Sequence, residues 1–327
     1  RLLYSFELWR QPDNPVPTEQ TRLSAPSEEA AGYLAQLVEQ VRAEPGLLGY
    51  YISDEPEINN VRSDYLENQY KLMRELDPYH PVIVTNDTLD GIITHGYRCA
   101  DILSPDPYSP DYDYVPNFMK RCLEVMGPGQ TVLLTPWHSS EQAHFVRDWG
   151  SAPPYPYRVM RNQYLASLAH GARGWTGYTS PFFMAETELR YGLPYIWREV
   201  RFLERAMAAP PPQVPLKIDA DAPMAGWLRK ADGLLYLVVV NHKPGARQVT
   251  VSHPLLRGVQ RLIVVSEGRE VQVQDGAFTD LFAEGDARIY TTDLRGHSFA
   301  TTREVEEELA RRRAQTARPG NLLHVSR

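Results

Sequence analysis

The chain has 327 residues, of which 43% are hydrophobic and 23% charged, and a formal net charge of −7. This composition is typical of a globular protein, and the length suffices for one large domain plus a smaller one. The acidic balance argues against nucleic acid or an anionic membrane as partner, and no apolar run reaches the roughly 18 residues of a membrane span.

Strand-like and helical segments alternate through the first two thirds of the chain. Strands are predicted at 2–9, 47–53, 80–85, 100–104, 131–135 and 174–179, and helices at 28–44, 63–76, 115–126, 156–170 and 194–208. Such alternation favours a parallel sheet with crossover helices. The simplest account is an α/β fold, a (β/α)8-type TIM barrel that lacks its first two strand–helix units. An open doubly wound sheet is the alternative.

The pattern changes after the proline-rich segment 208–213. Short strands are predicted at 225–229, 234–240, 248–251, 261–265, 271–273 and 288–290, without intervening helices. This spacing indicates a small antiparallel β-sandwich. Thr301 and Glu304 form a predicted capping box for a helix over 304–314. We therefore expect a barrel domain over 1–209, a sandwich over 214–295, and a helix with a linker over 296–327.

An apolar strand-like run from Leu47 to Ile52 leads into the acids Asp54, Glu55 and Glu57. Catalytic groups of barrels lie at the C-terminal ends of the strands, so this segment predicts part of an active site. Glycoside hydrolysis requires two carboxyl groups, and Glu55 is our candidate for the general acid. Partial burial beside other acids would raise its pKa as that role requires. The alternative is that these acids cap a helix or are simply solvated.

The second catalytic carboxylate is predicted at Glu141, which follows the strand at 131–135, with Asp106 as the next candidate. Polar and aromatic side chains at strand ends are candidates for substrate binding, because sugar pockets combine aromatic faces with a few polar groups. These candidates are Asp54, Trp9, Asn86, Asp106, Tyr108, Trp137, His138, Trp175 and Tyr178. Each aromatic side chain alone could equally be a core residue.

Other chemistries fit the sequence less well. Only Lys71 and Lys120 precede residue 217, and both lie in predicted helices, so no Schiff-base lysine is expected at a strand end. Neither a dinucleotide fingerprint nor a phosphate loop is present. His138 and His144 lack a clear third ligand, so we expect no metal and no cofactor.

Several of these motifs resemble clan A glycoside hydrolases. Ser53-Asp54-Glu55-Pro56 is similar to the Asn-Glu-Pro that ends their fourth barrel strand, which implies that Glu55 is the acid/base. The segments Ala100–Ile102 and Asp106–Tyr108 resemble the sixth strand of related bacterial barrels of poorly defined specificity. The stretch from Gln163 to Gly174 resembles the approach to their eighth strand.

The resemblance covers roughly residues 1–295, including a small β-domain of the kind that often follows such barrels. The chain departs from the clan pattern at two places. Asp54 replaces the usual asparagine, and Pro136-Trp137-His138 stands where the nucleophile glutamate would end the seventh strand.

We therefore expect a glycoside hydrolase that cleaves O-glycosidic bonds in a polysaccharide or glycoconjugate, with a carbohydrate as its partner and the oligomeric state open. The alternatives are a non-catalytic carbohydrate-binding barrel and a barrel lyase or isomerase. The sequence begins with Arg1. An upstream signal peptide would favour an extracellular or periplasmic location.

Overall fold

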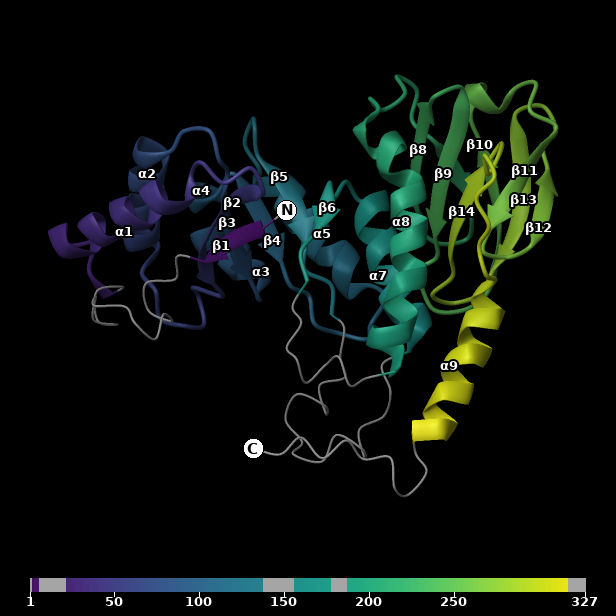
Figure 1. Ribbon diagram of the computed structural model, residues 1–327. Helices are drawn as coiled ribbons and strands as arrows, with labels where there is room; N and C mark the ends of the chain where they lie inside the picture. The colour runs from purple at the N-terminus through teal and green to yellow at the C-terminus, as the bar shows by residue number, and fades with distance from the viewer. Residues whose placement is uncertain (1, 6–21, 138–155, 178–186, 317–327) are drawn as a thin grey trace. The chain divides into compact units, whose positions relative to one another are not determined.

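A computed structural model describes residues 2–5, 22–137, 156–177 and 187–316 (Figure 1). The chain divides into two compact units, each described by itself below. Unit 1 comprises the described residues of Arg1–Ser109, Asn117–Pro136 and Gly171–Thr176, and unit 2 those of Pro110–Pro116, Trp137–His170 and Gly177–Arg327. This grouping differs from the domain boundaries expected from the sequence, which remain a prediction.

Unit 1 is built on a six-stranded parallel sheet in which strand order follows chain order. Its strands are β1 (Leu2–Ser5), β2 (Leu47–Asp54), β3 (Val82–Asn86), β4 (Ile102–Pro105), β5 (Thr131–Leu134) and β6 (Gly174–Trp175). Strands β3 and β4 are buried along their whole length, as expected for a parallel sheet covered on both faces. Because all pairings are parallel, the C-terminal ends of the strands lie along one edge.

Helices follow the strands of unit 1. They are α1 (Glu28–Val41), α2 (Ser63–Leu76), α3 (Leu89–Gly91), the π-helix η2 (Ile92–Gly96), α4 (Tyr97–Cys99) and α5 (Tyr114–Val125), most of which belongs to this unit. The hydroxyl of Ser27 caps α1 by accepting a hydrogen bond from the Ala30 amide at 3.2 Å. This helix buries Ala30, Leu34 and Val38, the stripe of a helix packed on one face.

Unit 2 contains two antiparallel sheets, ordered β13-β10-β7 and β12-β11-β14-β9-β8. Their strands are β7 (Lys217–Asp219), β8 (Ala225–Ala231), β9 (Leu234–Val240), β10 (Arg247–Ser252), β11 (Arg261–Val265), β12 (Arg269–Gln272), β13 (Ala277–Phe282) and β14 (Ala287–Thr291). The 3₁₀-helix η5 (Pro254–Leu256) follows β10. Side chains from both sheets share one hydrophobic cluster, including Val239 and Tyr290 from one sheet and Val249 and Phe282 from the other.

The described residues of unit 2 also form the helical segments α7 (Tyr157–Ala169), the π-helix η4 (Glu188–Gly192), α8 (Leu193–Ala208) and α9 (Thr302–Thr316) (Figure 1). Helix α7 packs against β8, β9 and β14, and α8 against β8. A buried ion pair joins the two helices, with Arg161 Nε and Nη2 at 2.8 and 3.0 Å from the two carboxylate oxygens of Glu199. The Ser266 hydroxyl also donates to Glu199, which connects the pair to the strands.

The predicted capping box at α9 is confirmed. The Thr301 amide donates to Glu304 Oε2 at 2.7 Å, and the Glu304 amide donates to Thr301 Oγ1 at 3.2 Å. Two orphan amides at the start of the helix are therefore satisfied reciprocally.

The expected mixed α/β class is confirmed, with parallel strands first and antiparallel strands after them. Strands β7 and β13 and the short helices within 89–99 were not predicted from the sequence. In the described part of the chain, no helix is both long and apolar enough to cross a membrane.

Candidate active site

The end of β2 forms a strained turn at Glu55. Its backbone has φ 45°, a left-handed conformation that is uncommon outside glycine. The Glu55 amide donates to Thr85 O of β3 at 3.0 Å, and the Asn59 side-chain amide donates to the carbonyl oxygens of Asp54 and Glu55 at 3.1 and 3.0 Å. Strain that neighbouring groups maintain in this way is typical of functional sites.

Asp106 comes directly after β4, and its side chain is 1% exposed. Its amide donates to Asn86 O at 3.2 Å, which fixes it at the end of β3 and β4. The Asp106 carboxyl also forms a hydrogen bond with Glu55. Burial raises the pKa of Asp106 well above its usual range, and the negative charge of Glu55 adds to the rise.

Three carboxyl groups converge at this edge of the sheet. One oxygen each from Asp54, Glu55 and Asp106 lie within 4.8 Å of one another. A proton shared between carboxyls would relieve the repulsion that such spacing imposes. These three side chains are also the described residues that could together hold a cation, since oxygen ligands suit Ca²⁺ and Mg²⁺.

Asp54 is oriented by a neighbour on its own strand. The Tyr51 hydroxyl donates to Asp54 Oδ1 at 2.6 Å, a short charge-assisted contact. Asp54 and Glu55 are both partly exposed, whereas Asp106 is buried. The cluster therefore has two carboxyl groups that are partly exposed to solvent and a third that is buried.

Glu57 braces the loop after β2 and does not join the cluster. Its Oε2 accepts from Asn86 Nδ2 at 2.9 Å, and its Oε1 accepts from the Thr88 amide at 3.0 Å. A Cβ atom at Gly91 would lie 2.1 Å from Glu57 Oε1, so a larger residue there would displace the Glu57 carboxylate from these contacts. Asn86, a predicted substrate-binding residue, is 1% exposed and its amide nitrogen is engaged by this brace.

Hydroxyl groups cluster at the ends of the next strands. Ser104 Oγ lies 3.0 Å from both Thr135 Oγ1 and Thr176 Oγ1, and the two threonine oxygens are 2.6 Å apart. These groups link the ends of β4, β5 and β6 through side chains. They hold the sheet edge that carries Asp106 without adding charge.

The structure brings together some of the predicted site residues. Asp54, Glu55 and Asp106 form the cluster, and Tyr108 and Trp175 are partly exposed residues of the same unit. Trp137 is buried, and its amide donates to Gln163 Oε1 at 2.9 Å within unit 2. The remaining candidates, Trp9, His138, Glu141 and Tyr178, lie outside the described residues.

Two residues of the site were not predicted: Tyr51 and Asn59, which hold Asp54 and the Glu55 turn. Burial raises the pKa of the nearby Asp87. Asp87 directly follows a strand, a signal that the sequence does contain. The contacts of Tyr51 and Asn59 depend on the left-handed turn, which no sequence motif predicts.

Comparisons with known proteins support the class of fold. Neither a family model nor a curated protein matches the sequence. Among solved structures, AmyP in complex with maltose is similar at a TM-score of 0.52 and 11% identity, over 92% of this chain and 75% of AmyP. A variant of AmyP in complex with maltotriose gives 0.51 and 11%, over 89% and 74%.

An α-amylase from Anoxybacillus, presented as a new glycosyl hydrolase subclass, has a TM-score of 0.48 and 12% identity over 80% of this chain. This chain spans 62% of that amylase, less than two thirds of its length. The structural neighbours are glycoside hydrolases, so the resemblance predicted from Ser53-Asp54-Glu55-Pro56 is confirmed at the level of the fold.

Proposed function

We propose that this protein is a glycoside hydrolase whose active site is the carboxyl cluster at the ends of β2 and β4. The observation that carries the proposal is the convergence of Asp54, Glu55 and Asp106 within 4.8 Å at the edge where barrel enzymes hold their catalytic groups. The six parallel strands would correspond to the last six of an eight-stranded barrel, and the two antiparallel sheets to a following β-sandwich. The likeness to AmyP supports this assignment.

Glu55 is the proton donor in this proposal. It is the accessible member of the hydrogen-bonded pair with Asp106, so it can reach a glycosidic oxygen. Donation of the proton accompanies cleavage of the bond between that oxygen and the anomeric carbon. Water then adds to the carbon and returns a proton to Glu55. Asp106 is a positioning residue, because it acts on the sugar only through Glu55 and keeps a proton at the pair.

Asp54 supplies the negative charge that faces the sugar. Its carboxylate, oriented by Tyr51, can stabilise positive charge at the anomeric carbon or accept a hydrogen bond from a ring hydroxyl. Glu141, the second carboxylate expected from the sequence, remains a prediction.

The test compares Glu55→Gln, Asp106→Asn and Asp54→Asn on a panel of α- and β-linked glycosides. We expect Glu55→Gln to lose about 10²–10⁴-fold in kcat/KM on substrates with poor leaving groups, the usual range for general acid catalysis. Dinitrophenyl glycosides do not require protonation, so the same variant should retain most of its activity on them. Glu75→Gln, an exposed acid on α2, is the matched control and should leave kcat/KM unchanged.

Unchanged hydrolysis of poor leaving groups by Glu55→Gln would remove Glu55 from the role of proton donor. Glycan binding without turnover would favour the non-catalytic barrel instead. Turnover that disappears with a chelator and returns with added Mg²⁺ or Ca²⁺ would favour a metal-dependent lyase or isomerase, for which the same three carboxylates could supply the ligands.

A further inference from the structure

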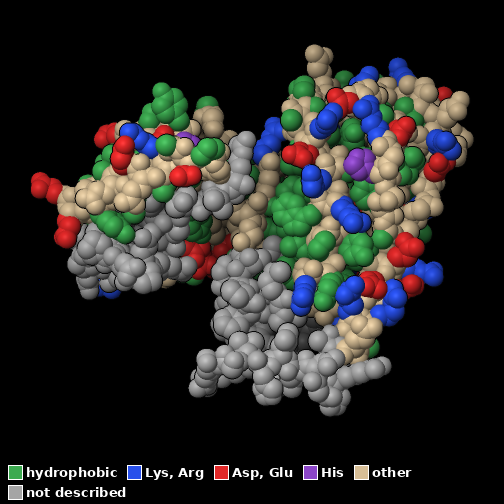
Figure 2. All heavy atoms as spheres, in the orientation of Figure 1, with side chains coloured by type: hydrophobic (Ala, Val, Ile, Leu, Met, Phe, Trp, Pro, Cys, Tyr) green, Lys and Arg blue, Asp and Glu red, His purple; other side chains and the backbone are tan. Residues whose placement is uncertain are grey.

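A cavity of about 830 Å³ lies in unit 2 beside the exposed face of α8. Helix α8 contributes Arg198, Arg201 and Arg205 to its lining, and the segment after β14 contributes Arg295, His297 and Phe299. Lys and Arg side chains lie beside hydrophobic ones on the face of unit 2 that carries α8 (Figure 2). The cavity therefore combines cationic and aromatic groups at an accessible surface.

The positive charge of this cavity is only partly neutralised. Arg205 Nη1 lies 3.0 Å from Asp232 Oδ2, and Arg295 donates to the Asp232 carbonyl oxygen. Arg198 and Arg201 have no ion-pair or hydrogen-bond partner among the residues that the structure describes. They lie three residues apart on α8 and are both exposed, so their guanidinium groups can act on one ligand.

Aromatic rings form one wall of the cavity. The ring of Phe202 lies 5.3 Å from those of Tyr236 and Phe299 and 5.4 Å from that of His297, in edge-to-face contacts. His297 and Phe299 are stacked, with an interplanar angle of 25°. Phe202 and Tyr236 are buried, whereas His297 is exposed. The buried rings therefore support an imidazole ring that a ligand can reach.

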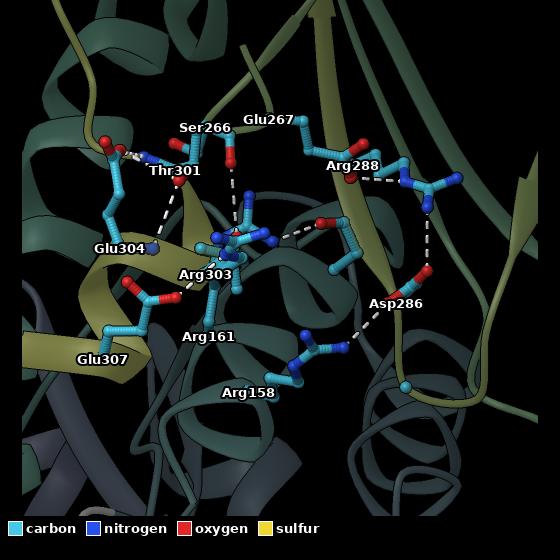
Figure 3. A pocket seen from close by; sticks show the side chains of 13 residues that line it. Arg158, Arg161, Ser266, Glu267, Asp286, Arg288, Thr301, Arg303, Glu304 and Glu307 are labelled. Carbon is cyan, nitrogen blue, oxygen red and sulfur yellow. Dashed lines mark hydrogen bonds and ion pairs between the residues drawn. The ribbon is translucent and has the colours of Figure 1, made fainter. Parts of the chain in front are cut away.

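A second cavity of unit 2 shows the opposite arrangement. It has a volume of about 610 Å³ near the start of α9, and Figure 3 shows Arg158 and Arg288 directed toward the Asp286 carboxylate. Arg158 pairs with Glu306, Arg161 with Glu199, Arg288 with Glu267, and Arg303 with Glu307. Its arginines already have carboxylate partners, whereas two of the four arginines of the cavity beside α8 have none within the part of the chain that the structure describes.

We propose that the cavity beside α8 binds a carboxylate-bearing glycan, such as a chain of uronic acid residues. A guanidinium group presents its hydrogen-bond donors in a planar arrangement that matches the two oxygens of a carboxylate. Arg198 and Arg201 would bind the carboxylates of the glycan in this way. The stacked His297 and Phe299 offer a flat surface for the apolar face of a sugar ring. The choice of a glycan rests on the proposed function, and the choice of an acidic one rests on the two arginines.

The experiment measures binding of an oligogalacturonate by isothermal titration calorimetry to the full chain carrying Glu55→Gln, so that turnover cannot interfere. We expect Arg198→Gln and Arg201→Gln each to weaken Kd about fivefold, the upper end for an exposed charge pair. The fully methyl-esterified oligomer should bind much more weakly, and added salt should reduce the affinity. Arg303→Gln, an exposed arginine on α9, is the matched control and should bind as the parent does.

Equal binding of the acidic and esterified oligomers would overturn the inference, as would unchanged affinity in the Arg198→Gln, Arg201→Gln double variant. Equally tight binding of poly-glutamate would overturn it too, because any polyanion would then suffice. If the acidic oligomer does not bind but Glu55-dependent hydrolysis is intact, the proposed function still stands. Binding without hydrolysis by the parent protein would instead remove only the catalytic proposal.

Discussion

Asp106→Asn should make the protein more stable at neutral pH, and the gain should depend on pH. The Asp106 side chain is 1% exposed, and burial raises its pKa well above the usual range. An aspartate in the unfolded chain has a pKa of about 3.9. Above that pH the folded state keeps a proton that the unfolded state has released, so stability falls as pH rises toward the folded pKa.

The size of the effect follows from proton linkage. Between the unfolded and the folded pKa, the folded state binds one proton that the unfolded state does not. The free energy of unfolding therefore falls by up to about 1.4 kcal/mol for each pH unit in this range. Asn has nearly the same shape and does not titrate, so Asp106→Asn removes this slope. Any constant cost of the new amide shifts the whole curve without changing its slope.

The assay is urea-induced unfolding of both proteins at several pH values between about 4 and 7, followed by loss of amide protection in β3 and β4. The difference in free energy of unfolding should grow with pH in favour of Asp106→Asn. Asp90→Asn, an exposed acid of unit 1, is the control and should change stability by less than about 0.5 kcal/mol. Parallel pH profiles for the parent and Asp106→Asn would refute the reasoning.

Two further changes test side-chain contacts of unit 1. Asn59→Ala removes two hydrogen bonds to the carbonyl oxygens of Asp54 and Glu55, so it should lower the free energy of unfolding by about 1–2 kcal/mol. An unchanged midpoint of urea unfolding would contradict the bracing role of Asn59. Hydrogen bonds from Tyr50 and His80 help to lower the pKa of Asp77 to about 2, against the burial that opposes them. The parent should therefore lose about 2 kcal/mol as pH falls from about 4 to 2, whereas Asp77→Asn should lose less over that window in acid-unfolding curves.

The strands and helices of unit 1 were largely predictable, because hydrophobic periodicity is a local property of the chain. The helix at 63–76 was predicted with the bounds of α2, and the strand at 47–53 with those of β2 to within one residue. The capping box of Thr301 and Glu304 was predictable for the same reason. Short or irregular elements such as β7 and η2 carry too little periodicity to be found this way.

Candidate site residues were predictable only as a set of strand-end side chains. Asp54, Glu55 and Asp106 were all in that set, but the sequence ranked Glu141 above Asp106 as the second carboxylate. The hydrogen bond between Glu55 and Asp106 joins the ends of β2 and β4, which are separated by β3. Their approach depends on the register of both neighbouring pairs and on the left-handed turn at Glu55.

The local sequence thus specified an acidic group at the end of a buried strand and a fold of the α/β class. Tertiary structure alone decided that Asp106 is buried against Glu55, that Glu57 turns away to brace Asn86, and that Arg198 and Arg201 have no partner among the described residues. The physical reason is that periodicity and capping act over a few residues. Burial, pKa and ion pairing depend instead on groups that the sheet brings together from distant parts of the chain.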